Sequence, residues 1–373
     1  MTMPRRVTAV LAACAAVLIA AAAAAAAVHW LRGPTLSFGR AWETATLLPD
    51  GDVLVAGGLG SLGAHRAGFE ASAALYEPSG NRFVRAPSMA TARFSHTATL
   101  LPDGMVLVAG GANSSGVLAS AELYDYRTNS WLGAAHMLTP RVNQTATSLF
   151  DGRVLVAGGI GPGGKALRSA ELYDPATNTW TRAPSMHEPR FHQTATLLLN
   201  GRVLIAGGER TAPDGSPILY RSAEIYDPST NRWSSAGSMA VPRANQVAAL
   251  LPNGRVLVAG GGELGIYSSS AEVYSPVTGR WHRVASMCCT RAFATATTLP
   301  GGRVLVAGGY AGQRSLSSTE LFDPASGRWL PAGRMHASRG HQAAALLSGG
   351  RVLVVGGQVY NGPFLASSDL YVP

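Results

Sequence analysis

Short apolar runs recur along the chain, and polar or glycine-containing turns separate them. One pattern returns almost unchanged: HTATLLPDGMVLVAGG at 96–111, NQTATSLFDGRVLVAGG at 143–159, HQTATLLLNGRVLIAGG at 192–208 and NQVAALLPNGRVLVAGG at 245–261. Two apolar runs joined by a P-D-G or P-N-G turn predict a tight β-hairpin. Because the runs are apolar almost throughout, we expect both faces of these strands to be buried. Helical periodicity is absent, so the pattern predicts an all-β protein.

A glycine pair ends the second run of each repeat. The pairs fall at 57/58, 110/111, 158/159, 207/208, 260/261, 308/309 and 356/357, which makes seven copies spaced 48 to 53 residues apart. A period near fifty residues indicates stacked supersecondary units. After each pair comes a loop of variable length, then a third strand such as SAELYDP (169–175). The polar turn that follows leads into a fourth strand that opens with Trp, as at 174–180.

Paired glycines after an apolar strand, followed by Tyr and Trp six to eight residues apart, resemble the Kelch repeat family, and the resemblance suggests a bacterial-type exported Kelch protein. The resemblance covers roughly residues 30–373. It implies a β-propeller, in which four-stranded antiparallel blades surround a central channel. The physical requirement agrees, because a closed ring buries both faces of every blade whereas a single blade cannot.

The spacing from each fourth-strand aromatic residue to the next arginine is ten residues throughout the chain. The pairs are Phe83/Arg93, Trp131/Arg141, Trp180/Arg190, Trp233/Arg243, Trp281/Arg291 and Trp329/Arg339, and Trp30/Arg40 has the same spacing. The last copy ends at SSDLYVP (367–373) and lacks a fourth strand. We therefore expect the segment 29–40 to complete the last blade. The sequence predicts one seven-bladed propeller over residues 29–373, closed by this N-terminal strand.

Residues 1–28 differ from the rest. Arg5 and Arg6 precede an apolar run of 22 residues, Val7–Val28, which is typical of a signal peptide cleaved after Ala27 or of an uncleaved membrane anchor. A lipoprotein signal ending at Cys14 is a weaker third interpretation, because the apolar run before this cysteine is short. The first two predict an exported protein, either secreted or periplasmic, or anchored in the cytoplasmic membrane with the propeller outside the cytoplasm.

Charged residues make up only 14% of the chain, and the net charge is +9. Lys165 is the only lysine, and the arginines are dispersed rather than gathered in one run. This distribution argues against a nucleic-acid-binding patch.

The loops after the glycine pairs and between blades vary in length and share one face, so we expect them to carry the function. The longest are 59–71 and 209–221. Arginine and aromatic residues, which are frequent in binding hot spots, decorate them. The candidates are Arg66, Phe69, Arg210, Tyr220, Tyr267, Tyr310, Arg314 and Tyr360. The alternative is that each simply covers a blade edge.

A second group of candidates lies near the expected mouth of the channel. Arginines that start the innermost strands are Arg40, Arg93, Arg141, Arg190, Arg243, Arg291 and Arg339. They would either grip an acidic ligand or pair with repeat acids such as Glu122, Glu171, Glu224, Glu272 and Glu320, and their recurrence in every blade favours the second role. The residues two positions after these arginines differ from blade to blade, which suits recognition of a particular ligand. They are Trp42, Ser95, Asn143, His192, Asn245, Phe293 and His341.

The rival hypothesis is a carbohydrate-active enzyme, galactose-oxidase-like or otherwise sugar-modifying, with its site on the axis. Only Glu43, His192 and His341 are titratable candidates there. His96 is one position out of step and should point the other way, so we expect no three-histidine metal site and no cofactor.

The adjacent cysteines Cys288 and Cys289 could form a disulfide or remain thiols. The sequence favours a monomeric binding module for a protein or a glycan over the enzyme and over a purely structural surface protein.

Overall fold

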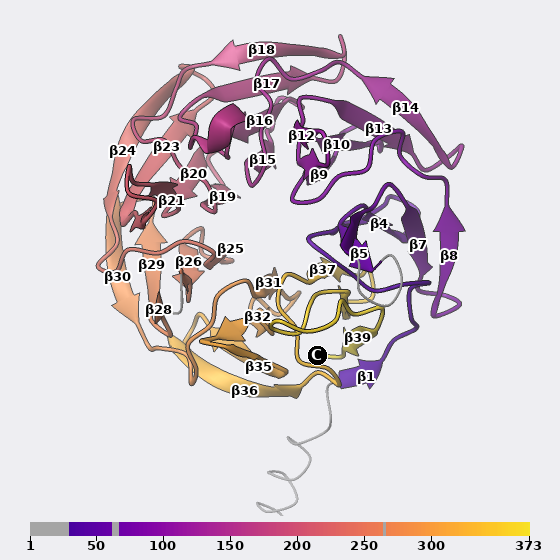
Figure 1. Ribbon diagram of the computed structural model, residues 1–373. Helices are drawn as coiled ribbons and strands as arrows, with labels where there is room; N and C mark the ends of the chain where they lie inside the picture. The colour runs from indigo at the N-terminus through magenta and orange to yellow at the C-terminus, as the bar shows by residue number, and fades with distance from the viewer. Residues whose placement is uncertain (1–29, 62–66, 264–265) are drawn as a thin grey trace, which may run out of the picture.

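The computed structural model describes residues 30–61, 67–263 and 266–373. In them, seven four-stranded antiparallel sheets stand around a central axis, and we call each sheet a blade (Figure 1). The predicted signal peptide or anchor, residues 1–28, lies outside the described residues. Within the described ranges no helix is long and apolar enough to cross a membrane.

The blades follow one another in chain order, and in each the first strand is innermost. Blade 1 consists of β3 (Thr44–Leu47), β4 (Val53–Ala56), β7 (Ala73–Glu77) and β8 (Arg82–Ala86). Blade 2 consists of β9 (Thr97–Leu100), β10 (Val106–Ala109), β13 (Ala121–Asp125) and β14 (Ser130–Ala134). Blade 3 consists of β15 (Thr145–Ser148), β16 (Val154–Ala157), β17 (Ala170–Asp174) and β18 (Thr179–Ala183). Blade 4 consists of β19 (Thr194–Leu197), β20 (Val203–Ala206), β23 (Ser222–Asp227) and β24 (Arg232–Ser238).

The remaining blades repeat the arrangement. Blade 5 consists of β25 (Val247–Leu250), β26 (Val256–Ala259), β29 (Ala271–Ser275) and β30 (Arg280–Val284). Blade 6 consists of β31 (Thr295–Thr298), β32 (Val304–Ala307), β35 (Ser318–Asp323) and β36 (Arg328–Arg334). Blade 7 consists of β37 (Ala343–Leu346), β38 (Val352–Val355), β39 (Ser368–Tyr371) and β1 (Trp30–Arg32).

Blade 7 is therefore built from both ends of the described chain, as expected. In β1, Trp30 stands opposite Tyr371, and the two rings lie 5.3 Å apart. Trp30 is only 2% exposed, and its indole N–H donates to the carbonyl of Ala332 in blade 6 at 2.9 Å. The ring is thus closed by a ladder and by a tryptophan that binds the neighbouring blade.

The apolar second strands form the core. All four residues of each are buried, because a neighbouring blade covers both faces of every sheet. Seven separate hydrophobic clusters result, and each joins strands of two adjacent blades.

The two faces of the ring differ. On one, which we call the varied-loop face, the connections between second and third strands form small hairpins. They are β5 (Leu59–Ser61) with β6 (Ala67–Phe69) and β2 (Arg40–Ala41), β11 (Ala112–Asn113) with β12 (Gly116–Val117), β21 (Glu209–Thr211) with β22 (Pro217–Leu219), β27 (Gly262–Glu263) with β28 (Ile266–Tyr267), and β33 (Tyr310–Ala311) with β34 (Arg314–Ser315). The short 3-10 turn η1 (Pro162–Gly164) takes this place in blade 3. On the opposite side, the short-turn face, tight turns join first to second and third to fourth strands.

One boundary differs from the prediction. The innermost strands begin four residues after the repeat arginines rather than at them, as between Arg93 and the start of β9 at Thr97. A residue with positive φ lies between, Ser95 in this blade. A left-handed residue cannot continue a β-ladder, so the strand starts only after it.

Candidate functional site: the axial collar

Seven residues form a collar around the channel mouth, each just before an innermost strand on the varied-loop face. They are the seven predicted from the uneven repeat position: Trp42, Ser95, Asn143, His192, Asn245, Phe293 and His341. All have left-handed backbone conformations, with φ between 50° and 57°. Asparagine tolerates this conformation, but bulky residues such as Trp42 and Phe293 seldom adopt it. Backbone strain of this kind, held in place by its surroundings, is common at functional sites.

Backbone hydrogen bonds link the collar from blade to blade. The amide of each of six collar residues donates to the carbonyl of the collar residue before it: Trp42 to His341, Ser95 to Trp42, Asn143 to Ser95, Asn245 to His192, Phe293 to Asn245 and His341 to Phe293, at 3.0 to 3.2 Å. In six blades the left-handed conformation thus turns the amide along the ring. The bonds join the backbones of neighbouring collar residues around most of the ring.

The part of the collar in blades 6, 7 and 1 is aromatic. The His341 ring lies 4.2 Å from Trp42 on one side and 4.2 Å from Phe293 on the other. Loop aromatics extend the stack: Tyr310 is 5.8 Å from Phe293, and Tyr360 is 5.5 Å from Tyr310. We call this group the aromatic arc.

Further aromatic residues border Trp42. The ring of Phe94 lies 6.3 Å from it and that of Phe364 lies 6.4 Å from it. Phe69, 37% exposed, packs 5.6 Å from Phe94. The loop candidates Phe69, Tyr310 and Tyr360 thus join the collar to the varied loops.

Blades 2 to 5 contribute polar collar residues instead, and one of them forms a pair with a buried acid. The Nδ1 atom of His192 lies 2.7 Å from Oε1 of Glu209. Glu209 is almost fully buried, and its Oε2 has no hydrogen-bond partner among the described residues. Glu209 was not predicted from the sequence. It directly follows a glycine pair, where the other repeats have Leu59, Ala112, Ile160, Gly262, Tyr310 and Gln358, so an acid at this variable position was the available signal.

The two collar histidines have different chemistry. Burial between aromatic rings lowers the pKa of His341 to about 3, with a smaller effect from His192, so His341 is a neutral stacking group at physiological pH. Burial also raises the pKa of the Tyr310 hydroxyl. Of the two collar histidines, His192 is the one that combines partial exposure with a carboxylate partner, Glu209.

The seven predicted arginines do not line the mouth. All are buried, with at most 2% exposure. In blade 5, for example, Arg243 donates to the carbonyls of Gly260 and Ser270 at 2.7 and 3.0 Å and to Glu272 Oε1 at 3.0 Å. Each of the other repeat arginines likewise donates to the carbonyl of the first glycine of its own blade's pair. These arginines are Arg40, Arg93, Arg141, Arg190, Arg291 and Arg339.

We call each pair of a repeat arginine and its acid, such as Arg243 and Glu272, a joint. The acid of the joint also accepts hydrogen bonds from the chain that arrives from the preceding blade. Glu272 accepts the backbone amides of Ala240 and Val241 at 2.8 and 3.2 Å. In blade 7 the acid is Asp369, which accepts a hydrogen bond from Arg339. Blade 1 has Ala74 at the position of the acid, and there Glu70 accepts a hydrogen bond from the Ser72 hydroxyl instead. The guanidinium groups are therefore used within the blades, and the ligand-gripping ring proposed from the sequence has no exposed donors.

Glu43 also lies away from the mouth. Its carboxyl is buried against Gly356 at the junction of blades 1 and 7, and neither oxygen has a hydrogen-bond partner among the described residues. Burial raises its pKa to about 8. In four other blades a glutamine takes this position and donates to the preceding blade, as Gln144 does to the Ala109 carbonyl at 2.9 Å. His96 takes it in blade 2, where its pKa is lowered to about 3 by burial, which agrees with its predicted direction away from the mouth.

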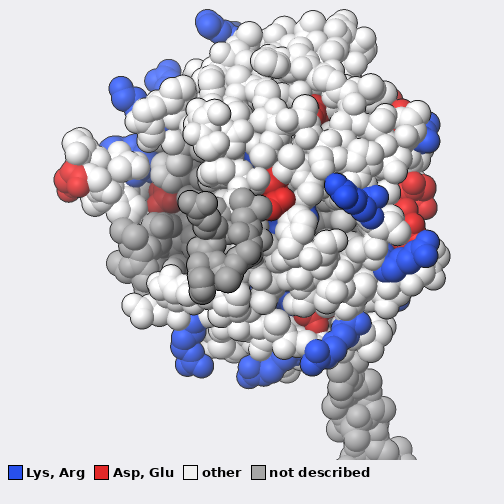
Figure 2. Space-filling view, turned by 45° about the vertical axis from the view of Figure 1, so that its right-hand side comes forward, with Lys and Arg blue, Asp and Glu red and all other residues white. Residues whose placement is uncertain are grey.

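The remaining loop candidates are spread over the varied-loop face. Arg314 is exposed, whereas Arg210, Tyr220 and Tyr267 are half-buried. Arg66 lies outside the described residues. In Figure 2, charged side chains are separated by broad uncharged areas, as expected for a chain with so few of them.

Cys288 and Cys289 lie between blades 5 and 6, with their sulfur atoms 3.0 Å apart and not bonded. The disulfide that the sequence allowed is therefore absent from this structure. Burial and the hydrogen bond to Cys289 raise the pKa of Cys288 to about 12, with a further effect from Glu320.

Comparison with known proteins defines the family. Residues 95–289, which are more than half of the chain, match the KLHDC2/KLHL20/DRC7 Kelch-repeats domain. Residues 291–336 match the Kelch motif. The chain belongs to the Kelch-repeat family. The predicted Kelch resemblance and the all-β propeller are thereby confirmed. No curated protein matches the chain.

Two solved structures resemble this Kelch propeller in fold. A novel fungal alcohol oxidase with catalytic diversity among the AA5 family, in complex with copper, has a TM-score of 0.75 at 23% identity, covering 92% of this chain and 76% of the oxidase. A structure of YjhT has a TM-score of 0.61 at 18% identity, covering 77% and 97%. The copper belongs to the oxidase: in the described part of the Kelch propeller no three His, Cys, Asp or Glu side chains are grouped so that they could hold a metal.

Proposed function

We propose that the protein is an exported binding module that engages a protein or glycan partner at the axial collar and the surrounding varied loops. The observation that carries this proposal is the aromatic arc. The bulky residues Trp42 and Phe293 are half-buried and held in strained left-handed conformations, although polar residues occupy the same position in other blades. Aromatic side chains supply large contact areas with little loss of conformational entropy, which suits a recognition surface.

Export rests on the N-terminal segment. Arg5 and Arg6 followed by the apolar run 7–28 support either a cleaved signal or an anchor. Both place the propeller on the outside of the cytoplasmic membrane. Intact-mass measurement of protein recovered from the cell envelope distinguishes them, since cleavage after Ala27 removes the first 27 residues.

The test of the binding module uses the full-length protein to recover partners from envelope extracts and to probe a glycan array. A double variant, Trp42→Ser and Phe293→Asn, replaces two arc residues with residues that other blades use at this position. We expect recovery to fall at least tenfold. The control Val277→Thr changes the opposite face and should retain the partner. Equal recovery by the arc variant and the wild type would show that the arc is not the binding surface.

The varied loops are tested separately. Charge reversal at Arg66, Arg210 and Arg314 should abolish recovery without lowering the melting temperature. If recovery is unchanged, the partner does not use these loops.

One observation favours the carbohydrate-active enzyme as a second candidate. In the pair of His192 and Glu209, the acid can accept the Nδ1–H and leave Nε2 to act as a general base. Incubation with a panel of mono- and disaccharides, followed by NMR, would reveal conversion. An enzyme of this kind should lose it in His192→Gln, and absence of any conversion by the wild type removes this candidate.

A further inference from the structure

The short-turn face, opposite the collar, has an uneven distribution of charge. The turns and adjoining strand ends of blades 4 to 7 carry seven arginines against two acids, Asp227 and Asp323. The arginines are Arg202, Arg232, Arg255, Arg280, Arg303, Arg328 and Arg351, of which all but Arg351 are exposed. Among the described residues only Arg202 of this set forms an ion pair, with Asp227 at 2.9 Å.

The other half of the same face is acidic. In blades 1 to 3 the corresponding turns carry Arg82, Arg127 and Arg153 against Asp50, Asp52, Glu77, Asp103, Asp125, Asp151 and Asp174. Each of these three arginines is paired with an acid of its own turn. The basic excess of the short-turn face is therefore confined to blades 4 to 7, which we call the basic half.

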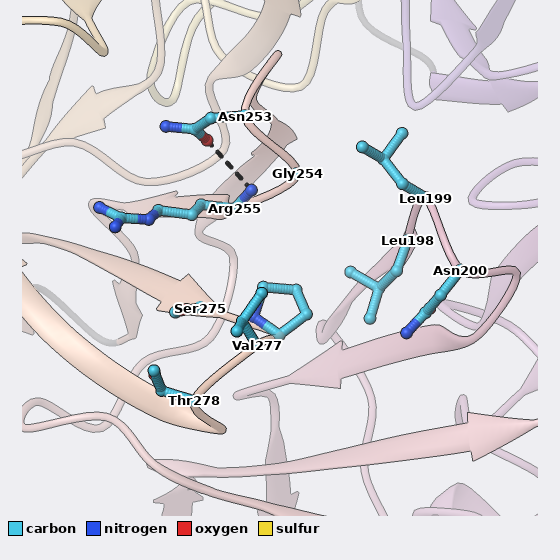
Figure 3. Close-up of a pocket in the computed structure, with 10 residues that line it drawn as sticks. Leu198, Leu199, Asn200, Asn253, Gly254, Arg255, Ser275, Val277 and Thr278 are labelled. Atoms are coloured by element: carbon cyan, nitrogen blue, oxygen red, sulfur yellow. Dashed lines mark hydrogen bonds between the residues drawn. The ribbon is translucent and has the colours of Figure 1, made fainter.

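Among the clefts on the basic half, two combine apolar walls with arginine. Figure 3 shows the first, about 580 Å³ in volume, with Leu198, Leu199 and Asn200 of blade 4 on one side and Arg255 and Val277 of blade 5 on the other. The second, about 590 Å³, lies between blades 6 and 7, and both Arg303 and Arg351 line it.

Apolar side chains project from this half as well. Val277 is 95% exposed at the tip of its turn, and Leu199 is 64% exposed. At the position of Leu199, blades 1, 2, 5 and 6 have proline, blade 7 has serine, and blade 3 has Phe150, which is 71% exposed. A basic surface with protruding apolar side chains can bind phosphate groups and insert into the layer beneath them.

The position of the first strand relates this face to the N-terminal segment. Trp30 pairs with Tyr371, and Tyr371 pairs with Val352, the residue that follows the short turn of blade 7. The chain therefore enters the ring at the short-turn face of blade 7. Its first strand, β1, lies beside β39 at the outer edge of this blade (Figure 1). The 29 residues that precede Trp30 include the apolar run 7–28. An anchor formed by this run would bring the short-turn face toward the bilayer.

We propose that the basic half binds the anionic phospholipid surface of the membrane, so that the propeller lies with its short-turn face on the lipid and its collar exposed. The charge, the projecting Val277 and Leu199, and the entry point of the chain all favour a lipid surface over an acidic protein. The proposal does not depend on what the collar binds.

The test uses the full-length protein with two kinds of vesicle: phosphatidylcholine alone, and phosphatidylcholine mixed with anionic phosphatidylglycerol. The apolar run contributes to binding in both, so the ratio of the two partition coefficients isolates the electrostatic part. The variant carries Arg255→Glu, Arg303→Glu and Arg351→Glu. The matched control reverses three arginines of the varied-loop face, Arg210→Glu, Arg221→Glu and Arg314→Glu.

We expect the wild type to prefer the anionic vesicles, and less so as salt is raised. Each arginine near an anionic surface contributes about fivefold to partitioning, and each introduced glutamate is also repelled, so the short-turn variant should reduce the preference for anionic vesicles at least about 100-fold while the control keeps most of it. Hydrogen exchange should be slowed by anionic vesicles in the turns near Arg255 and Arg303 and not near Asp50 and Asp103.

Three results would overturn the proposal. The first is equal partitioning of the wild type into both kinds of vesicle. The second is an equal loss in the control, which would indicate a general effect of net charge. The third is protection of the same turns by a polyglutamate peptide but not by anionic vesicles, which would identify the basic half as a site for an acidic protein.

Discussion

At the scale of single residues, Glu43 shows how one substitution changes the chemistry of a repeated position. The glutamines of other blades donate to a carbonyl of the preceding blade, as Gln246 does to Ala206 at 2.8 Å. A carboxylate cannot donate, whereas a protonated carboxyl can. The raised pKa of about 8 therefore means that Glu43 folds in its neutral form.

Replacing Glu43 with glutamine should stabilise the protein in a pH-dependent way. Because the pKa is higher in the folded state than in the unfolded state, the stability associated with the neutral carboxyl is complete below the ordinary value of 4.5 and is lost as pH rises toward 8. Relative to Glu43→Gln, the wild type should lose about 3–5 kcal/mol of unfolding free energy over this range. Denaturant unfolding at pH 4 and pH 9 measures it. The control Gln246→Glu should create a similar dependence in blade 5, and parallel curves for wild type and Glu43→Gln would refute the assignment.

Phe293 illustrates the second residue-scale feature, which is the backbone strain of a collar residue that we propose to contact the partner. Its φ of 56° costs about 1–2 kcal/mol for a bulky residue, while its contacts with His341 and Tyr310 return about as much. Phe293→Asn should therefore change the unfolding free energy by less than about 1 kcal/mol and still weaken partner binding at least tenfold.

Thermal melting and partner recovery are measured on the same preparation of Phe293→Asn, with Asn143→Ser as the control on the polar side of the collar. If Phe293→Asn lowers the unfolding free energy by much more than about 1 kcal/mol, the role of Phe293 is packing rather than recognition.

At the scale of elements, the joint of arginine and acid connects the strands of one blade to the segment that arrives from the previous blade. Arg243 and Glu272 show the full set of contacts, with both side chains buried. A buried pair is not a strong source of net stability, but removing one partner leaves an uncompensated charge in the interior.

Arg243→Met should therefore destabilise the protein by about 3–5 kcal/mol, and adding Glu272→Gln should recover part of the loss. The matched control is Arg202→Met, because Arg202 pairs with Asp227 at 2.9 Å on the surface with its side chain 50% exposed. Its loss should cost less than about 1 kcal/mol. Chemical denaturation of the four proteins compares them, and a similar effect for both arginines would contradict the role of burial.

At the scale of the whole molecule, stability depends on closing the ring, since each blade is covered only by its neighbours. The closing strand β1 contributes just three residues. Trp30 is the buried residue of this strand, with its ring against Tyr371 and its indole N–H bonded to the Ala332 carbonyl in blade 6.

Trp30→Ala should destabilise the protein by about 3–5 kcal/mol because it empties a buried site. Leu31→Ala in the same strand changes a side chain that is 50% exposed and should have little effect. Melting curves of the three proteins decide this prediction, and a Trp30→Ala curve identical to that of the wild type would show that β1 does not hold the ring closed.

Repetition explains how much could be predicted from the sequence. The glycine pairs, the P-D-G turns and the ten-residue spacing from Trp to Arg are local signals, and they recur often enough to define the strands, the varied-loop face and the closure by Trp30. The collar positions were found for the same reason, because they follow each arginine by two residues.

Tertiary structure decided what each of these residues does. The burial of the arginines, the neutral carboxyl of Glu43 and the pairing of His192 with Glu209 depend on contacts between segments that are 17 or more residues apart. The division of the short-turn face into an acidic and a basic half depends on which blades stand side by side around the ring. Sequence periodicity specifies the local backbone of each repeat, but burial and charge environment are set by neighbours that only the closed ring brings together.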